Sequence, residues 1–153
     1  MAYINPKTDW AIKVINGVYT GDFLNVSDYE RITGNIDYLA TVINNVYGKS
    51  IVLEPMPVRT VNSIPYASDF NALENNIELL CENLTVPSAW TEKKTWYANK
   101  PTPTVGDWNR WEGTILGLKE RIDYDAQWTD FLTADNEPLY GSDGNEFMVL
   151  EGA

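Results

Sequence analysis

The stretch SDYERITGNI, residues 27–36, occurs three times along the chain in related form. The second copy reads SDFNALENNI at residues 68–77, and the third reads GDWNRWEGTI at residues 106–115. The aligned residues Asp28, Asp69 and Asp107 recur about every 40 positions, which is the range of supersecondary repeats. A packing unit is therefore repeated, and we expect the chain to be built for assembly.

Each copy continues with apolar residues at alternating steps of three and four. This spacing predicts an amphipathic helix with one narrow buried stripe. We expect helices over about residues 27–47, 68–84 and 105–122. The stripes comprise, copy by copy, Tyr29, Ile32, Ile36, Leu39, Ile43 and Val46; Phe70, Leu73, Ile77, Leu80 and Leu84; and Trp108, Trp111, Ile115, Leu118 and Ile122.

Polar residues at the beginning of each copy predict the helix starts. Ser27 and Glu30 fit a capping box, in which each side chain binds the other residue's backbone amide. A carboxylate in the first turn also offsets the positive end of the helix dipole by about 0.3–1 kcal/mol. We therefore assign a structural role at the helix starts, in preference to a catalytic one, to Ser27, Asp28, Ser68, Asp69, Thr104 and Asp107.

The segments around the helices predict small β elements. Residues 11–15 and Val18-Tyr19 flank Asn16-Gly17, a strong hairpin-turn signal. After Tyr124, short apolar pairs alternate with Asp, Asn and Gly turns, which favours a β-hairpin-like tail. These apolar pairs are Phe131-Leu132, Leu139-Tyr140 and Phe147-Met148.

The predicted fold class is mainly α, a three-helix bundle built from the triplicated motif. Extended connectors that contain proline join the helices, because proline cannot serve in a central strand. The segment 51–58 in particular is expected as an edge or covering arm. We divide the chain into an N-terminal arm or hairpin (1–25), a helical repeat domain (26–124) and a β-repeat tail (125–153).

Composition argues against several partners. The chain has 22 acidic and 11 basic residues and a formal charge of −11, which disfavours nucleic acid and anionic membranes. We see no basic region followed by an apolar signal core at the start and no apolar run long enough for a membrane span. These features predict a protein that is made in a cytoplasm and stays soluble.

The chain contains no histidine, which removes the commonest general base and most zinc sites. It also lacks a phosphate-binding loop, and we expect no catalytic residue, no cofactor and no metal ligand. Two alternatives remain at this stage: a carboxylate pair of the glycoside hydrolase type, and a calcium site in the acidic segments 135–137 and 143–146. Helix capping and turn chemistry explain the same residues.

Several single residues carry structural predictions. Arg31 and Arg110 occupy equivalent positions and are expected to pair with a neighbouring acid or helix end, which would locate the repeats against one another. Gly113 and Gly117 interrupt a helix at a cost of about 1 kcal/mol each, which a close helix–helix approach would offset. Cys81 is expected to be a small buried hydrophobe.

Aromatic residues outside the stripes are candidates for an interface with a protein or a glycan. Packing over the core is the alternative interpretation of the rings in the connectors. The candidate interface residues are Trp10, Trp90, Trp96, Tyr97, Trp128, Tyr140 and Phe147.

The repeated Asp-aromatic motif, together with Lys7-Thr8-Asp9-Trp10 and Lys94-Thr95-Trp96, resembles segments of tail, baseplate and fibre-associated structural proteins of phages and prophages of Gram-positive bacteria. The segment 138–144 is similar to the short Asp-Gly strand repeats of such proteins. The resemblance implies a non-enzymatic structural or adaptor subunit of a virion, assembled in the host bacterial cytoplasm. Its implied partners are other virion proteins and further copies of itself; a glycan-binding module at the tail tip and a wall-degrading hydrolase are the alternatives.

Overall fold

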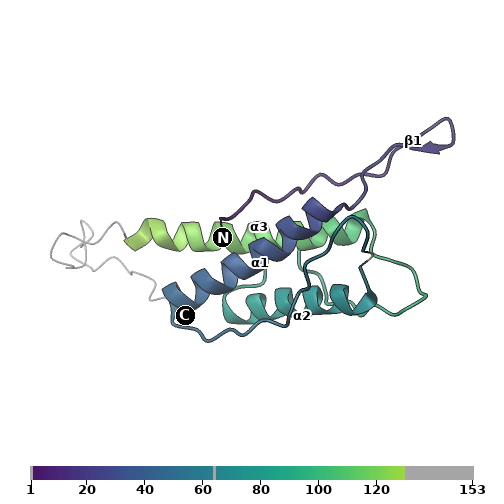
Figure 1. Cartoon of the computed structure of the whole chain (residues 1–153). Helices are drawn as coiled ribbons and strands as arrows, with labels where there is room; N and C mark the ends of the chain where they lie inside the picture. The colour runs from purple at the N-terminus through teal and green to yellow at the C-terminus, as the bar shows by residue number, and fades with distance from the viewer. Residues whose placement is uncertain (1, 64, 130–153) are drawn as a thin grey trace, which may run out of the picture.

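Three helices make up most of the computed structural model, which describes residues 2–63 and 65–129. Helices α1 (Val26–Tyr47), α2 (Ala67–Asn83) and α3 (Val105–Thr129) pack on one another, and strands β1 (Val14–Ile15) and β2 (Val18–Tyr19) form an antiparallel hairpin (Figure 1). This confirms the mainly α prediction and the N-terminal hairpin. The β elements predicted for residues 130–153 lie outside the described residues.

The turn of the hairpin follows from its sequence. Asn16 and Gly17 both have positive φ, 51° and 76°, as a two-residue turn of the hairpin type requires. Helix α1 ends as predicted, with Gly48 in the left-handed conformation at φ 63°.

Two predicted helix limits were wrong. The capping box of α1 is formed by Asn25 with Asp28, while Ser27 donates its hydroxyl hydrogen bond to Asn25 Oδ1. Asparagine is as good an N-cap residue as serine, because its side-chain oxygen can also accept a backbone N–H, here that of Asp28. Helix α3 continues past the predicted end at 122 to Thr129, so residues 125–129 of the predicted tail are helical.

All three helices run in the same direction. Arg31 near the start of α1 contacts Glu112 near the start of α3, and Tyr47 at the end of α1 bonds Asp125 near the end of α3. Figure 1 shows α2 in the same orientation, with the hairpin projecting beyond the N-terminal ends of the helices. A parallel bundle needs a return path before each new helix, which explains the long connectors.

Two extended arms supply these return paths: residues 48–63 and 65–66 (arm 2) and residues 84–104 (arm 3). Residues 2–25, which precede α1 and include the hairpin, are here named arm 1. Arm 2 shows the direction of travel, because Ile51 bonds Asn44 late in α1 whereas Arg59 bonds Asp69 in the first turn of α2. Each arm lies against two helices: arm 1 against α1 and α3, arm 2 against α1 and α2, and arm 3 against α2 and α3. The prediction of a covering arm at residues 51–58 is confirmed.

Asparagine side chains hold the arms to the helices. In each case the side-chain oxygen accepts the backbone N–H of an arm residue, and the side-chain nitrogen donates to the same residue's carbonyl, as a neighbouring strand would. These two hydrogen bonds give the N–H and the carbonyl of the arm residue the partners that a neighbouring strand would otherwise provide. The five pairs are Asn35 with Ile4, Asn109 with Trp10, Asn44 with Ile51, Asn76 with Glu54, and Asn71 with Trp96.

The core consists mainly of the predicted stripes. Ten of these side chains are fully inaccessible: Ile32, Ile36, Leu39, Ile43, Leu73, Ile77, Leu80, Trp111, Ile115 and Leu118. Val46 is exposed, while Leu84 and Trp108 are half-buried. Within the described part of the chain, no helix has both the length and the apolar character that crossing a membrane requires.

The close approach at the α3 glycines differs from the prediction. A Cβ at Gly113 would lie 3.0 Å from Ala89 Cβ, and one at Gly117 would lie 2.6 Å from Pro87 Cβ. Both neighbours belong to arm 3, so the glycines admit an arm and not a second helix. The sequence comparison between copies suggested a helix partner because the arms were not expected to fill the grooves.

We predict that Gly117→Ala lowers the free energy of unfolding by about 1–2 kcal/mol, because the new methyl group overpacks against Pro87. Gly106→Ala is the matched control, since its nearest neighbour is Thr104 Oγ1 at 3.6 Å. It should leave stability unchanged or raise it by up to about 1 kcal/mol. Urea unfolding measures both; stabilisation by Gly117→Ala would contradict the packing of arm 3.

Candidate functional site

The repeated aspartates lie in the first turn of each helix, and each also binds a backbone amide. Each carboxylate accepts the amide three residues earlier, at distances of 3.2, 2.7 and 2.9 Å. The pairs are Asp28 with Asn25, Asp69 with Tyr66, and Asp107 with Thr104. Ser68 is exposed in the first turn of α2.

Each of these carboxylates also has a cationic partner. Asp28 pairs with Arg31 at 2.8 Å, Asp107 with Lys94 at 2.7 Å, and Asp69 with Arg59. Although burial acts to raise it, hydrogen bonds from Lys94 and the Thr104 amide hold the pKa of Asp107 below its ordinary value. The carboxylates therefore serve in helix capping and ion pairing at the same time.

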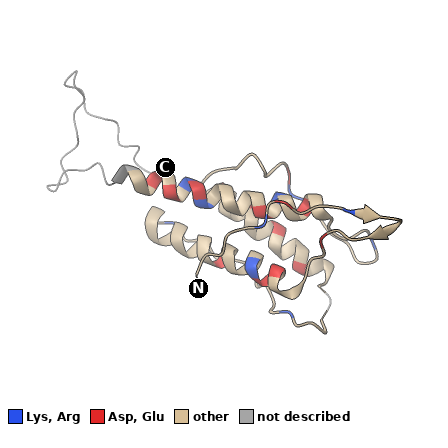
Figure 2. Ribbon diagram, turned by 90° about the horizontal axis from the view of Figure 1, so that it is seen from above, with Lys and Arg blue, Asp and Glu red and all other residues tan. Residues whose placement is uncertain are grey.

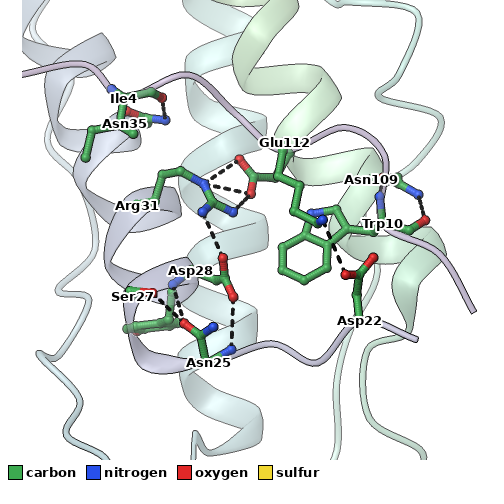
Figure 3. A network of polar contacts seen from close by, with 12 residues as sticks. Ile4, Trp10, Asp22, Asn25, Ser27, Asp28, Arg31, Asn35, Asn109 and Glu112 are labelled. Atoms are coloured by element: carbon green, nitrogen blue, oxygen red, sulfur yellow. Dashed lines mark hydrogen bonds and ion pairs between the residues drawn. The ribbon is translucent and has the colours of Figure 1, made fainter. Parts of the chain in front are cut away.

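Two ion pairs connect neighbouring helices one turn further along. Arg31 of α1 reaches Glu112 of α3 (Figure 3). Arg110 of α3 reaches Glu74 of α2. Both glutamates are fully buried. The prediction that Arg31 and Arg110 locate the repeats against one another is confirmed.

The third equivalent pair is missing. In the aligned copies, Ala72 of α2 stands where the other helices have arginine, and Thr33 of α1 stands where they have glutamate. Two of three possible crossed pairs are thus present. The differences between copies make the α1–α2 contact the uncharged one of the three.

Each buried carboxylate among the described residues has a cationic partner. Glu74 also accepts the indole N–H of Trp111 at 2.8 Å. Burial raises the pKa of Glu112, with Arg31 acting in the opposite direction. Burial likewise raises the pKa of the Cys81 thiol to about 12, and the residue is buried as predicted. Buried carboxylates that are each paired with an arginine are typical of ion pairs with a structural role.

Among residues 2–63 and 65–129, no three His, Cys, Asp or Glu side chains come together as a metal site would require. The acidic segments 135–137 and 143–146, weighed above as calcium ligands, lie outside this range. The prediction of no metal therefore stays a prediction for the whole chain.

The predicted interface aromatics occupy different environments. Trp10 is only 4% exposed and packs edge-on against Trp108 at 5.0 Å, whereas Tyr97 is 66% exposed. Trp90 and Trp96 are half-buried against the core. The side chain of Trp128 and residues Tyr140 and Phe147 lie outside what the structure describes.

Two of these aromatic residues line a surface hollow of about 310 Å³, here named the Trp96 hollow. Tyr66, Phe70, Trp96 and Tyr97 provide its rings, and Asn99, Lys100 and the prolines of residues 101 and 103 complete it. Trp96 packs edge-on against Phe70 and Trp111. The inner wall is therefore fixed by the core, while Tyr66 and Tyr97 remain exposed.

The hairpin forms a second candidate surface that the sequence did not mark as an interface. The strands and the residues that flank them, here included in the hairpin, expose several apolar side chains: Ile12 by 67%, Val14 by 58%, Ile15 by 48%, Val18 by 63% and Phe23 by 68%. Figure 2 shows that charged residues lie mostly along the helices, whereas the two strands are largely uncharged. A strand with one buried face alternates apolar and polar residues. Both faces of these strands are apolar, and this departure from alternation was the signal in the sequence that could have indicated an interface.

Comparison of the chain with protein-family models, curated proteins and solved structures gives no match. The functional argument therefore rests on the surfaces and charges described above.

We predict that Arg110→Met lowers the free energy of unfolding by about 3–5 kcal/mol, because it leaves the buried Glu74 carboxylate without its guanidinium. Adding Glu74→Leu should recover a large part of that loss, because the uncompensated charge is removed. Lys119→Met, which breaks the exposed pair with Asp123, should cost about 0.5 kcal/mol or less. Equal effects of the two single variants in chemical denaturation would refute the structural role of the buried pair.

We also predict a pH-dependent effect at Asp107. Because its pKa is lower in the folded state, its ionised form stabilises the protein above about pH 4, the ordinary range of an unfolded aspartate. This stabilisation is lost as the pH falls through the lower folded pKa. Asp107→Asn should therefore destabilise at pH 7, by about 1–3 kcal/mol, and the difference from wild type should shrink below pH 4.

The matched control is Asp123→Asn, an exposed position on the same helix. Its difference from wild type should stay small across the pH range. Thermal unfolding at several pH values measures both variants; a difference at Asp107 that grows in acid would contradict the pairing with Lys94.

Proposed function

We propose that this chain is a non-enzymatic structural or adaptor subunit of a phage virion, in the tail, baseplate or fibre attachment, and that its hairpin docks onto neighbouring proteins. The observation that carries the proposal is the apolar hairpin that projects beyond the bundle (Figure 1). The motif resemblance to phage structural proteins supports the virion setting. Other virion proteins and further copies of the chain are the proposed partners.

The hairpin is poorly suited to remain alone in water. A two-stranded piece is marginally stable by itself, and exposed clusters of apolar side chains commonly mark protein interfaces. Backbone groups on the outer edges of a hairpin can also pair with an added strand. Docking would bury Val14, Val18 and Phe23 and complete the small sheet.

The two ion pairs between helices also support a structural role. Arg31, Arg110 and their glutamate partners connect helices inside the chain and so rigidify the bundle that presents the hairpin. A rigid base lowers the entropy that docking would cost.

The test replaces valine by threonine, which keeps the branched shape but adds a hydroxyl. We expect Val14→Thr/Val18→Thr to weaken association with adjacent virion proteins about tenfold or more, through lost apolar burial. The unfolding temperature should barely change, since both side chains are already exposed. Size-exclusion chromatography with light scattering and incorporation into particles are the measurements.

The control is Val52→Thr/Val58→Thr, two residues of arm 2 that are each 84% exposed. This variant should associate like wild type. The proposal is contradicted if the wild-type chain never joins a particle. It is also contradicted if the hairpin variant assembles like wild type.

A second candidate function is glycan binding at the phage tail tip, favoured by the Trp96 hollow. Its exposed tyrosine rings and the polar side chains of Asn99 and Lys100 can contact a sugar's apolar and hydroxyl faces. Tyr97→Ala should abolish signals on a glycan array, while Phe23→Ala, an exposed ring of the hairpin, should not. A flat array with wild-type protein would dismiss this function.

A further inference from the structure

The outer edge of strand β1 carries backbone groups that point away from β2. The carbonyls of Ala11 and Lys13 accept amides of the opposite strand. Because inward and outward residues alternate along an antiparallel strand, the N–H and C=O groups of Ile12 and Val14 point outward. Within the described part of the chain, the sheet has two strands and none lies beside this edge. The edge is therefore a template that an extended peptide can continue.

The side chains next to this edge are apolar. Ile12 and Val14 are 67% and 58% exposed, and the alternation of a strand puts both on the same face. On β2 the outward positions are Tyr19 and Gly21. Gly21 has no side chain, and the Tyr19 ring already packs edge-on against Phe23 at 4.7 Å. The β1 edge is therefore the better acceptor for a strand with apolar side chains.

The chain itself contains a matching segment beyond α3. Residues 147–150 read FMVL and lie between Glu146 and Glu151. This apolar run, which has no proline or glycine, continues the Phe147-Met148 pair that the turn pattern predicts as a strand. Added along β1, the run would place alternate apolar side chains beside Ile12 and Val14.

Charge also favours this segment. Lys13 is the one basic residue of the range 11–23, and among the described residues it is exposed and has no carboxylate partner. An exposed pair with a flanking glutamate adds at most about 1 kcal/mol, but it selects an acidic strand over a basic one. Residues 130–153 contain no lysine or arginine, and six of them are acidic: Asp130, Asp135, Glu137, Asp143, Glu146 and Glu151.

The hairpin and the end of α3 lie at opposite ends of the bundle. The hairpin projects beyond the N-terminal ends of the helices, while α3 runs to Thr129 at the other end (Figure 1). Helix α3 has 25 residues and is about 37 Å long. A return to the hairpin of the same copy would order about eleven extended residues along that length, at about 1–2 kcal/mol for each. The hairpin of a second copy placed beyond Thr129 requires no such return.

We propose that residues 147–150 of one copy add as a third strand to the β1 edge of a second copy, so that copies join head to tail. This rests on the hairpin docking proposed above and names its partner. The contact joins two different surfaces, so it closes into a ring or continues as a filament.

Analytical ultracentrifugation of the full chain measures this self-association. The mean mass of wild type should rise with concentration. Ile12→Pro removes an outward backbone donor of β1 and leaves the bonds to β2 intact. It should weaken self-association about tenfold or more, the value of a lost hydrogen bond together with lost side-chain contact.

The second variant changes the added strand. In Met148→Pro/Val149→Pro, one of the two prolines removes a donor to β1 in either register, because consecutive residues point in opposite directions. Self-association should again weaken about tenfold or more. Ser142→Pro/Asp143→Pro, which places the same two rings in the turn-forming stretch before the run, is the matched control and should associate like wild type.

Mixing the two defective variants separates a contact between copies from one within a copy. Ile12→Pro keeps an intact run 147–150, and Met148→Pro/Val149→Pro keeps an intact hairpin. An equimolar mixture should therefore form heterodimers, although neither variant self-associates. The proposal is overturned if wild type stays monomeric, if the mixture stays monomeric, or if Met148→Pro/Val149→Pro associates like wild type.

The hairpin docking proposed above fails on a different result, namely normal incorporation of Val14→Thr/Val18→Thr into particles. If that variant is excluded from particles while Met148→Pro/Val149→Pro self-associates like wild type, the hairpin docks on another virion protein. Only the strand addition between copies is then refuted.

Discussion

The parallel direction of α1, α2 and α3 requires the chain to run back along the bundle before α2 and again before α3. Helix α1 has 22 residues and is about 33 Å long, a distance that about ten extended residues can cover. Arms 2 and 3 provide these returns, and each of the three arms lies against two helices. Since they have no sheet to join, their backbone groups need side-chain partners, and five asparagines provide them. Helices and arms therefore depend on each other.

Parallel helices also bring three positive dipole ends to one end of the molecule. The first-turn aspartates offset these ends, and the adjacent arginines and lysines neutralise the aspartates in turn. The crossed pairs Arg31–Glu112 and Arg110–Glu74 then fix how far each helix is shifted along its neighbour. The hairpin projects beyond this charged end (Figure 1). The Trp96 hollow, lined by Tyr66 and Phe70 at the start of α2, lies close to it. The proposed interaction surfaces are thus carried by the most constrained part of the fold.

The helices, their buried stripes, the Asn16-Gly17 turn and the pairing of Arg31 and Arg110 could all be predicted from local patterns. Helix direction could not, because a stripe such as Ile32–Ile36–Leu39 reads the same in either orientation. The asparagine contacts were hidden because Asn71 and Asn109 are unremarkable polar residues until an arm lies beside them. The end of α3 was missed because its apolar stripe was followed only as far as Ile122 and the tail was expected to change character after Tyr124.

Amide hydrogen exchange tests the central claim, that side chains on parallel helices hold irregular arms in place of a sheet. The backbone amides of Ile4, Trp10, Ile51, Glu54 and Trp96 each donate to an asparagine oxygen. They should exchange much more slowly than that of Val52, whose exposed residue lies between two of them in arm 2, although none of them belongs to a helix or strand. Exchange of all five amides at the rate of an unstructured peptide would contradict this account of the fold.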